Sequence, residues 1–418
     1  MRPPRAGIEA LNVFPGSACI ELAELAAARG LDAARFDNLL MRQKTVALPH
    51  EDPVTFAANA ARPLVDGLDA GEKDRIEMLI TCSESGIDFG KSLSTYVHQY
   101  LGLNRNCRLF EIKQACYSGT AGFQTALNAV LAQVSPGAKA LVVATDISRF
   151  VMASGSDALT QDWAFTEPSS GAGAVALLVG EEPAVFQADV GANGYYGYEV
   201  MDTCRPEPDS EAGNADLSLL SYLDCCEQSF AEYARRVAGA DYRESFHQLA
   251  FHVPFGGMVK GAHRTMLRKL KRATAADIES DFQARVLPGL RHAQRVGNIM
   301  GGSLFMSLAS IVDHAADGAP LRVGCFSYGS GCCSEFFSGV VPAGARELQR
   351  RFRIGDQLDA RHRLSMDEYA RVLADSGQVR FGTRNVRLPE QPLAPQLTGA
   401  RLVLREIAEF HRRYEWVS

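Results

Sequence analysis

The sequence predicts an α/β fold in which helices cover a central sheet. Short apolar segments bounded by polar or glycine residues alternate with segments of helical period, and this alternation is typical of layered α/β proteins. The chain has 418 residues, of which 46% are hydrophobic and 22% are charged. That composition is typical of a globular protein, and the length is large for one core. We therefore expect two packed domains or two halves of a duplicated unit.

The ends of the predicted elements are marked by glycines and polar residues. Two segments of helical character, 18–30 and 92–102, end in Gly30 and Gly102, which suit the left-handed position after a helix. The segment 108–112 is predicted as a strand, followed by a sharp connection and a helix that runs to about Gln133. The other predicted buried strands are 75–82, 139–145, 171–180, 247–251 and 321–329.

The stretch 181–215 differs in composition from the segments around it. It is rich in Gly, Pro, Asn and Asp, which predicts a long loop between two halves of the chain. The segments 171–180 and 328–341 are faintly alike, which hints at an internal duplication. We expect one half at 1–180, carrying Glu84 and Cys116, and the other at 181–418.

Charge and cysteine usage exclude several classes of protein. A net charge of −6 argues against nucleic acid as the main partner. No apolar run is long enough for a signal peptide or a membrane span, so we expect a cytoplasmic protein with no membrane partner. The ten cysteines include no C-x-x-C pair, which disfavours a disulfide framework and a metal site. No G-x-G-x-x-G fingerprint lies in a strand–turn–helix context, so we expect no nucleotide or flavin.

Cys116 lies between the predicted strand 108–112 and the helix that follows it, among small residues. A helix start lowers the pKa of a thiol through its dipole and free N–H groups, and the same groups can hold an oxyanion. Taken alone this is a weak signal, because most cysteines in such a chain are buried small hydrophobic residues.

Other reactive residues also follow predicted strands or glycine turns. They are Glu84, His252, Asn298 and Ser330. Open α/β sheets place ligands at the carboxyl ends of strands, so these positions can converge. Three of the four also have a structural interpretation: Glu84 as a helix cap, His252 as a satisfied core histidine, Ser330 as part of a glycine loop. His263 competes with His252, but its basic amphipathic context fits a surface helix.

The segment 263–272 holds five cations within ten residues. Arg264, Arg268 and Lys271 recur at helical spacing. The sequence leaves two interpretations open, a solvated helix face or a docking surface for an acidic partner.

Five segments, in chain order, resemble the signature segments of 3-hydroxy-3-methylglutaryl-CoA synthases. They are TCSESGIDFGKS, EIKQACYSGTAGFQTALN, FHVPFGGMVKG, RVGNIMGGSLFMSLAS and FSYGSGCCSEFFSG. The resemblance spans the chain from AGIEALNVF to past residue 340. It implies the thiolase fold, a duplicated five-layer αβαβα architecture, and a homodimer. It also implies an acyltransferase that forms C–C bonds without a metal or other cofactor.

The resemblance implies a role for each of these residues. Cys116 is the nucleophile that accepts an acetyl group, Glu84 is the general base and acid that removes a proton from the acetyl methyl, and His252 is the general acid that polarises the acceptor ketone. The N–H groups of Cys116 and of the loop 329–331 would hold the enolate oxygen. The residues implied to bind substrate are Asn298, Ser330, Tyr117 and Gly329.

A narrower resemblance is to the stand-alone synthases of bacterial polyketide β-branching cassettes. It is carried by LNRNCRLFEIKQACYSGTAGFQ, GANGYYGYEVMDTCRPEPDSEAG and LSYLDCCEQSF. Those enzymes add an acetyl-derived branch to a β-ketoacyl chain on an acyl carrier protein. The implied partners are donor and acceptor acyl carrier proteins, polyketide synthase modules and the enoyl-CoA-hydratase-like enzymes of the cassette.

One departure from the wider family supports a carrier-bound substrate. CoA-using relatives have lysines at two positions after the catalytic histidine, and Gly257 and Gly261 stand there in this chain. Such lysines can meet the phosphates of free CoA, whereas a carrier-bound phosphopantetheine has one phosphate. Candidates for contact with that phosphate or with the carrier are Arg35, Lys260, Arg264 and Arg268, since carrier proteins are acidic.

Three alternatives remain open from the sequence. The first is a primary-metabolic synthase that uses acetyl-CoA. The second is a ketosynthase-III-like condensing enzyme, which Glu84 disfavours because decarboxylation needs no base at a methyl group. The third is a non-catalytic scaffold that only binds carrier proteins.

Overall fold

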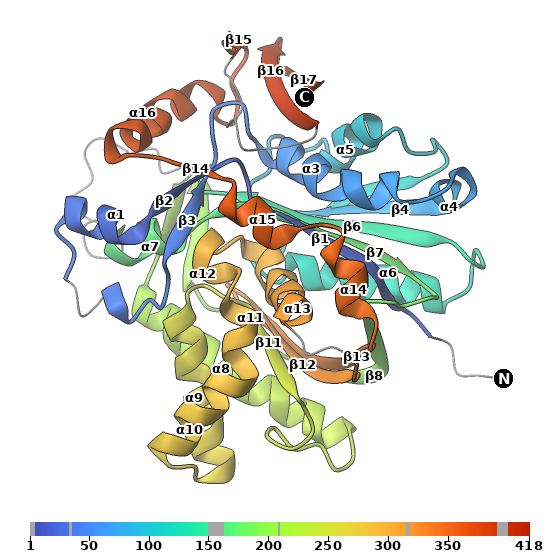
Figure 1. Cartoon of the computed structure of the whole chain (residues 1–418), viewed down its shortest axis with the longest axis vertical. Helices are drawn as coiled ribbons and strands as arrows, with labels where there is room; N and C mark the ends of the chain where they lie inside the picture. The colour runs from blue at the N-terminus through green and yellow to red at the C-terminus, as the bar shows by residue number, and fades with distance from the viewer. Residues whose placement is uncertain (1–4, 33–35, 149–162, 208–209, 315–317, 391–399) are drawn as a thin grey trace.

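The computed structural model describes the chain except residues 1–4, 33–35, 149–162, 208–209, 315–317 and 391–399. Nine strands of the described chain form the central sheet, in the order β11–β12–β13–β8–β1–β7–β6–β4–β5 (Figure 1). Their bounds are β1 Gly7–Phe14, β4 Ile76–Cys82, β5 Arg108–Ile112, β6 Lys139–Ile147, β7 Ala172–Gly180, β8 Phe186–Gly197, β11 Gln248–Phe251, β12 Leu321–Gly329 and β13 Cys333–Val341. The mixed α/β class expected from the sequence is therefore confirmed.

The strand order repeats within the sheet. β1 pairs antiparallel with β7, β7 antiparallel with β6, and β6 parallel with β4. In the same way β8 pairs antiparallel with β13, β13 antiparallel with β12, and β12 parallel with β11. A short antiparallel contact, Gly7 to Gln187 and Ile8 to Phe186, joins the two sets. Both sets thus have the same order and the same succession of antiparallel and parallel pairings.

Helices form layers on both sides of the strands. α3 (Pro53–Asp66) and α6 (Ser118–Leu131) pack on β6 and β7, while α8 (Ala215–Arg236) packs on β8 and β13, and α13 (Ser303–His314) packs on β11. In Figure 1, α3 and α5 (Leu93–Leu101) lie above the strands, α6 and α13 lie in the middle, and α8 lies below. Asp52 starts α3 with a capping box, and Pro53 follows at a position where its missing N–H costs no hydrogen bond.

The remaining elements extend from these layers. The other helices are α1 Leu22–Arg29, α4 Ala70–Asp74, α7 Trp163–Ser169, α9 Gly256–Lys271, α10 Ala275–Asp281, the π-helix η2 Phe282–Val286, α11 Leu287–Leu290, α12 Ala293–Val296, the short η3 Met300–Gly302, α14 Ala345–Arg350, α15 Ile354–Asp359, α16 Met366–Ser376 and η4 Gly377–Val379. The small sheets are β2 Ala18–Glu21, β3 Gln43–Val46 and β14 His362–Arg363; β9 Thr203–Glu207 and β10 Ser210–Gly213; and β15 Val386–Arg387, β16 Arg401–Ala408 and β17 His411–Val417.

The predicted strands and two of the helix ends are found as expected. β6 and β7 are buried along their whole length, which explains why both read as continuous apolar runs. Gly30 and Gly102 follow α1 and α5 with φ of 64° and 59°, in the left-handed region that glycine adopts without strain.

Two expectations from the sequence were wrong. The predicted helix at 18–30 begins only at Leu22, because residues 18–21 form β2 and pair with β3 and β14. A short apolar run fits a strand as well as a helix, and here the neighbouring strands decide. The predicted loop 181–215 contains β8, β9 and β10. Its Gly194 serves helix packing rather than a turn, since a Cβ there would lie 2.2 Å from the Ser229 carbonyl oxygen of α8.

Candidate active site

Cys116 lies in a tight turn between β5 and α6. The Tyr117 N–H donates to the Gln114 carbonyl at 3.0 Å and the Ser118 N–H donates to the Ala115 carbonyl at 3.2 Å. Ala115 has a φ of 43°, which is strained for a residue with a side chain. The turn places Cys116, half-buried, beside the first residues of α6.

Close backbone packing holds this turn against the second set of strands. A Cβ on Gly329, at the end of β12, would lie 2.6 Å from the Tyr117 nitrogen. A Cβ on Gly119 in α6 would lie 2.1 Å from the Gly301 carbonyl oxygen in η3. Because only glycine permits these approaches, both positions join the start of α6 to the loops that follow β12 and precede α13.

Glu84 follows β4, as expected, and reaches the thiol. The Cys116 Sγ lies 3.5 Å from the Glu84 Oε1. The Glu84 main-chain N–H donates to the Asp146 Oδ1 at 2.9 Å, and the same oxygen accepts from the Ser85 hydroxyl at 2.8 Å. Asp146, on β6, is fully buried, so it anchors the turn that presents Glu84.

A buried arginine occupies the other side of Glu84. The Arg205 Nε on β9 lies 3.2 Å from the Glu84 Oε2, and both side chains are 16% exposed. A second nitrogen of Arg205 pairs with Glu211 of β10 at 2.7 Å. The site therefore holds one guanidinium among the carboxyl groups of Glu84, Asp146 and Glu211.

Burial and mutual repulsion raise the pKa values of the acidic groups. Burial raises the pKa of Glu84, while the Arg205 charge opposes that rise. Burial and then the Glu84 charge raise the pKa of Asp146 to about 7. The raised Glu84 pKa agrees with the expectation for a base in a dry site.

The expected lowering of the Cys116 pKa is wrong for the resting site. Burial, followed by the charge of Glu84, raises the pKa of this thiol. The helix start is a weaker influence than the desolvation of a thiolate next to carboxylates. Cys116 therefore rests as a thiol that faces a carboxyl group, and its proton must leave as it attacks.

His252 follows β11 and is almost fully buried. Its N–H donates to the Phe326 carbonyl of β12 at 2.8 Å, and its carbonyl accepts from the Tyr222 hydroxyl at 2.6 Å. Burial lowers the pKa of its imidazole to about 3, so the ring is neutral. The Nδ1 of its ring is buried and has no hydrogen-bond partner among the described residues.

Asn298 lies between α12 and α13, and the loop 329–331 follows β12. The Asn298 Oδ1 accepts from the Met300 N–H and the Ser303 hydroxyl, both at 2.9 Å, so this oxygen caps the start of α13. The side-chain NH₂ is then the group with which Asn298 would meet a substrate. In the loop, the Gly331 N–H donates to the Asp202 carboxylate at 2.9 Å, which removes it from the expected oxyanion donors.

Comparisons with known proteins identify the family of this chain. Residues 2–184 match the N-terminal region of hydroxymethylglutaryl-coenzyme A synthase, and residues 263–416 match its C-terminal region. The chain belongs to the hydroxymethylglutaryl-coenzyme A synthase family. Enzymes of this family condense acyl groups and form C–C bonds, and they have the thiolase fold, which confirms the fold expected from the resemblance.

Relatives with described activities include carrier-dependent and CoA-dependent synthases. The chain is 64% identical to the polyketide biosynthesis 3-hydroxy-3-methylglutaryl-ACP synthase PksG of Bacillus subtilis, over 99% of each chain. It is 35% identical to the hydroxymethylglutaryl-CoA synthase of Enterococcus faecalis, over 88% of this chain and 92% of that one. The curacin pathway HMG synthase in complex with acetyl donor-ACP superposes with a TM-score of 0.95, at 62% identity, and covers 99% of this chain and 100% of that one.

Tyr117 points its hydroxyl to a buried carboxylate of the synthase fold. That hydroxyl donates to the Glu335 Oε2 at 2.7 Å, and Glu335, on β13, is fully buried. Gln124 of α6 and Asn193 of β8 donate to the other oxygen of Glu335. Burial raises the pKa of Glu335. Tyr117 therefore ties the nucleophile turn to the second set of strands.

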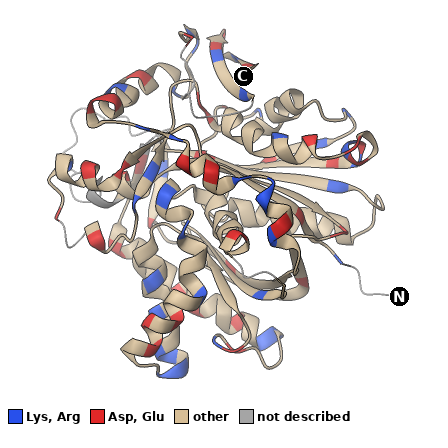
Figure 2. Cartoon of the chain, in the orientation of Figure 1, with Lys and Arg blue, Asp and Glu red and all other residues tan. Residues whose placement is uncertain are grey.

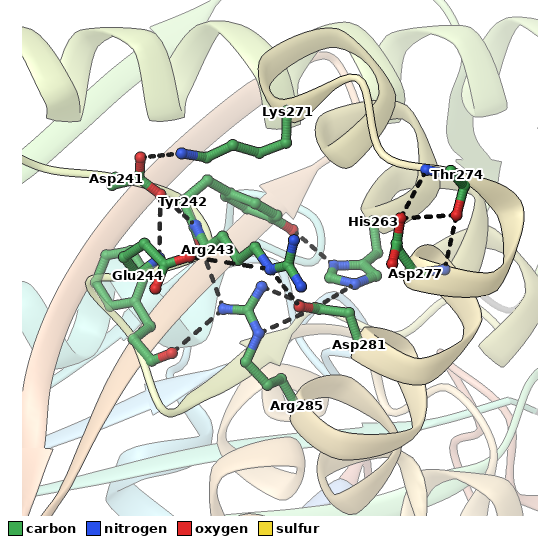
Figure 3. Close-up of polar contacts among 11 residues, drawn as sticks. Asp241, Tyr242, Arg243, Glu244, His263, Lys271, Thr274, Asp277, Asp281 and Arg285 are labelled. Carbon is green, nitrogen blue, oxygen red and sulfur yellow. Dashed lines mark hydrogen bonds and ion pairs between the residues drawn. The ribbon is translucent and has the colours of Figure 1, made fainter.

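His263 is buried and does not lie on a surface, which corrects the sequence-based expectation (Figure 3). The His263 Nε2 lies 2.9 Å from the Asp281 Oδ1, and the Tyr242 hydroxyl lies 3.1 Å from the His263 Nδ1. Arg285 pairs with the same aspartate at 2.8 Å. The residue is on the inner face of amphipathic α9, so it holds the helix in place and is not a second catalytic histidine.

The basic candidates have different environments. Arg35 lies outside the described residues. Lys260 pairs with Glu279 of α10 at 2.7 Å. Arg264 and Arg268 are exposed, and neither forms an ion pair within the described part of the chain. Figure 2 shows basic and acidic ribbon segments together on α9 and α10, so the cationic character of this surface is partly offset.

Sequence reasoning missed several residues of this site. Arg205 and Glu211 were hidden in the stretch expected to be a loop, and Asp146 is the next-to-last residue of β6, just beyond the segment 139–145 that was predicted as a strand. Charged residues that interrupt apolar strands are the signal that would have found Asp146 and Glu335. In the part of the chain that the structure describes, no His, Cys, Asp and Glu side chains group as metal ligands, and no helix is long and apolar enough to cross a membrane.

We predict that Glu84→Gln makes Cys116 more reactive toward alkylation. The substitution removes the neighbouring negative charge and the carboxylate acceptor, both of which raise the thiol pKa, while Arg205 stays in place. The rate of iodoacetamide addition at Cys116, followed by intact-protein mass spectrometry from neutral to alkaline pH, should increase. Glu227→Gln, which removes the exposed partner of Lys269, is the control and should leave the rate unchanged. A slower reaction in Glu84→Gln would contradict the described electrostatics.

Proposed function

We propose that this chain is an acyl-carrier-protein-dependent 3-hydroxy-3-methylglutaryl synthase that installs β-branches on carrier-bound polyketides. The observation that carries the proposal is the contact of 3.5 Å between the Cys116 Sγ and the Glu84 Oε1 in a buried site. A nucleophile and a base so close together can act on the same acetyl group. The likeness to PksG and to the curacin pathway synthase, which was crystallised with acetyl donor-ACP, supports the carrier-bound substrate.

The first step transfers an acetyl group to Cys116. The sulfur attacks the thioester carbonyl of the donor carrier, and its proton passes to Glu84. The C–S bond to the donor arm breaks, and that arm leaves as a thiol after taking the proton from Glu84. The products are acetyl-Cys116, an ionised Glu84 and a free donor carrier.

The second step forms the C–C bond. Glu84 removes a proton from the acetyl methyl, and the Cys116 N–H stabilises the enolate oxygen. The resulting carbanion attacks the β-ketone of the acceptor chain. The neutral His252 hydrogen-bonds to that ketone and stabilises the alkoxide, which takes up the proton that Glu84 removed from the acetyl methyl, so that Glu84 is ionised again. Asn298 and Ser330 line the acyl site beside them.

The last step releases the product by hydrolysis. Water adds to the Cys116 thioester, the C–S bond breaks, and the acetyl-derived carbon becomes a free carboxylate. The product is a 3-hydroxy-3-carboxymethyl chain on the acceptor carrier. Such a tertiary alcohol next to a carboxymethyl group is a substrate for dehydration, which fits enoyl-CoA-hydratase-like enzymes and a polyketide synthase module as functional partners.

The packing of α9 supports a carrier over free CoA. A Cβ on Gly257 would lie 1.9 Å from the Asn38 carbonyl oxygen, so no lysine fits at this position. At Gly261 no described atom lies within 4 Å of an added Cβ. The chain therefore lacks both phosphate-binding lysines of CoA-using relatives, and one of the two positions is closed to any side chain.

We predict that acetylation and condensation separate in two variants. Mixing the protein with acetyl-carrier protein should add one acetyl mass, and Cys116→Ala should abolish this gain. Glu84→Gln should still acquire the acetyl group, although more slowly because Glu84 relays the thiol proton, but it should lose condensation on the order of 10²- to 10⁴-fold, the usual contribution of a general base. Both are read by mass spectrometry of the enzyme and of a β-ketoacyl acceptor carrier. Undiminished condensation in Glu84→Gln would favour a ketosynthase-like enzyme, and no acetyl gain in the unmodified protein would favour a scaffold.

We predict that acetyl-carrier protein is a far better donor than acetyl-CoA. Gly261→Lys should improve the use of acetyl-CoA on the order of ten-fold, because one charge-assisted contact contributes roughly 1.5 kcal/mol. The kcat/KM for acetylation is measured with both donors, and Gly355→Lys, at another open glycine, is the control. Equal efficiency with both donors in the unmodified protein would contradict carrier dependence.

We further propose a homodimer formed through β5. This strand is at the edge of the sheet, and its Leu109, Phe110 and Ile112 are only partly buried, so a second copy would cover them. Light scattering after gel filtration should give a molar mass of twice the chain mass. In Phe110→Lys the molar mass should fall toward that of a single chain. Val134→Lys, at an exposed position, is the control. A dimer that persists in Phe110→Lys would place the interface elsewhere.

A further inference from the structure

We propose that the hairpin β9–β10 is a positioning device for the general base, in which Glu211 holds Arg205 and Arg205 holds Glu84. Arg205 and Glu211 lie in the segment that reads as a loop and that no step of the proposed chemistry uses. Neither is placed to exchange protons with substrate. Arg205 contacts Glu84, and Glu211 contacts Arg205, so both act through the base. The inference rests on the proposed function.

The geometry assigns each oxygen of Glu84 a separate task. Oε2 faces the Arg205 Nε at 3.2 Å, and Oε1 faces the Cys116 Sγ at 3.5 Å. Rotation of the carboxyl group away from the thiol would break the contact with the guanidinium. The arginine thus fixes the orientation in which Glu84 can reach the methyl of an acetyl group on Cys116.

Glu211 fixes Arg205 in turn. The Arg205–Glu211 pair measures 2.7 Å, and the Arg205 side chain is 16% exposed whereas Glu211 is 34% exposed. A long buried side chain with one ionic partner can take several rotamers, and a second partner on the adjacent strand selects one of them. Because β9 and β10 pair antiparallel, with Ala212 opposite Cys204, the two residues lie on adjacent paired strands.

Charge balance gives the device a second effect. The groups that face Glu84 are Asp146 on β6, Cys116 before α6, Arg205 on β9 and Glu211 on β10. Arg205 lowers the pKa of Glu84, and Glu211 raises it. The positive charge of Arg205 is therefore shared between Glu84 inside the site and the more exposed Glu211.

The test compares pH profiles of condensation in two variants. Arg205→Gln removes the cation, so Glu84 should ionise at higher pH. The part of the rate–pH curve that reports this ionisation should move to higher pH, and the condensation rate near neutral pH should fall on the order of 10²-fold. Glu211→Gln removes a negative charge, so that Glu84 is the remaining ion-pair partner of Arg205. The same part of the rate–pH curve should move to lower pH, and the condensation rate should fall by a smaller factor. A general loss of stability would not move the rate–pH curves of these two variants in opposite directions. Shifts in the same direction, or none, would overturn the proposal.

Two further measurements keep the result separate from the proposed function. Acetylation of Cys116 is assayed on its own and should stay within a few-fold of the unmodified protein in Glu211→Gln, and Arg205→Lys should recover part of the activity lost in Arg205→Gln.

Infrared difference spectra follow the titration of the Glu84 carboxyl without any substrate. For each variant, the spectrum of the same variant with Glu84→Gln is subtracted. If the unmodified protein does not condense, the proposed function fails, whereas the positioning proposal fails only if these titrations do not shift apart. Glu232→Gln, in an exposed ion pair of α8, is the control and should shift neither profile.

Discussion

The site depends on direct contacts between main-chain atoms at two glycines, where no side chain would fit. Gly329 at the end of β12 lies against the turn at Tyr117, and Gly119 in α6 lies against Gly301. These contacts press the nucleophile turn of one set of strands onto the loops of the other. Glu84, Cys116, His252 and Asn298 come from distant parts of the chain. Without the close approach, the turn that holds Cys116 would not lie against the end of β12 and the segment before α13.

The second organising feature is a shortage of positive charge. One buried guanidinium, Arg205, lies among the carboxyl groups of Glu84, Asp146 and Glu211. In this largely buried site, the imbalance favours the protonated forms of Glu84 and Asp146. The result is a carboxyl group able to accept and return a proton at neutral pH, next to a thiol that stays protonated until a thioester arrives. The neutral His252 fits the same pattern, since a charged imidazole would be costly at this depth.

Sequence reasoning recovered the elements with strong local signals. Local composition is enough to predict β6 and β7, which are continuous apolar runs. It is also enough to predict the ends of α1 and α5, which are glycines. The catalytic candidates were found because each follows such an element and because the set matches a family. Arg205 and Glu211 could not be found in this way, because their hairpin is defined by pairing and burial rather than by residue type. The burial of His263 was missed for a related reason: a basic helix has an inner face, and which residue points inward depends on Asp281 and Tyr242, far along the chain.

The contact of Gly257 with Asn38 has an evolutionary consequence. Of the two positions where CoA-dependent relatives keep a lysine, Gly261 is open and a point mutation can fill it, but Gly257 is closed by main-chain atoms of another segment. A lysine at Gly257 would require the segment at Asn38 to move first. If two lysines were introduced one after the other, the backbone would have to be rebuilt before the second could contribute.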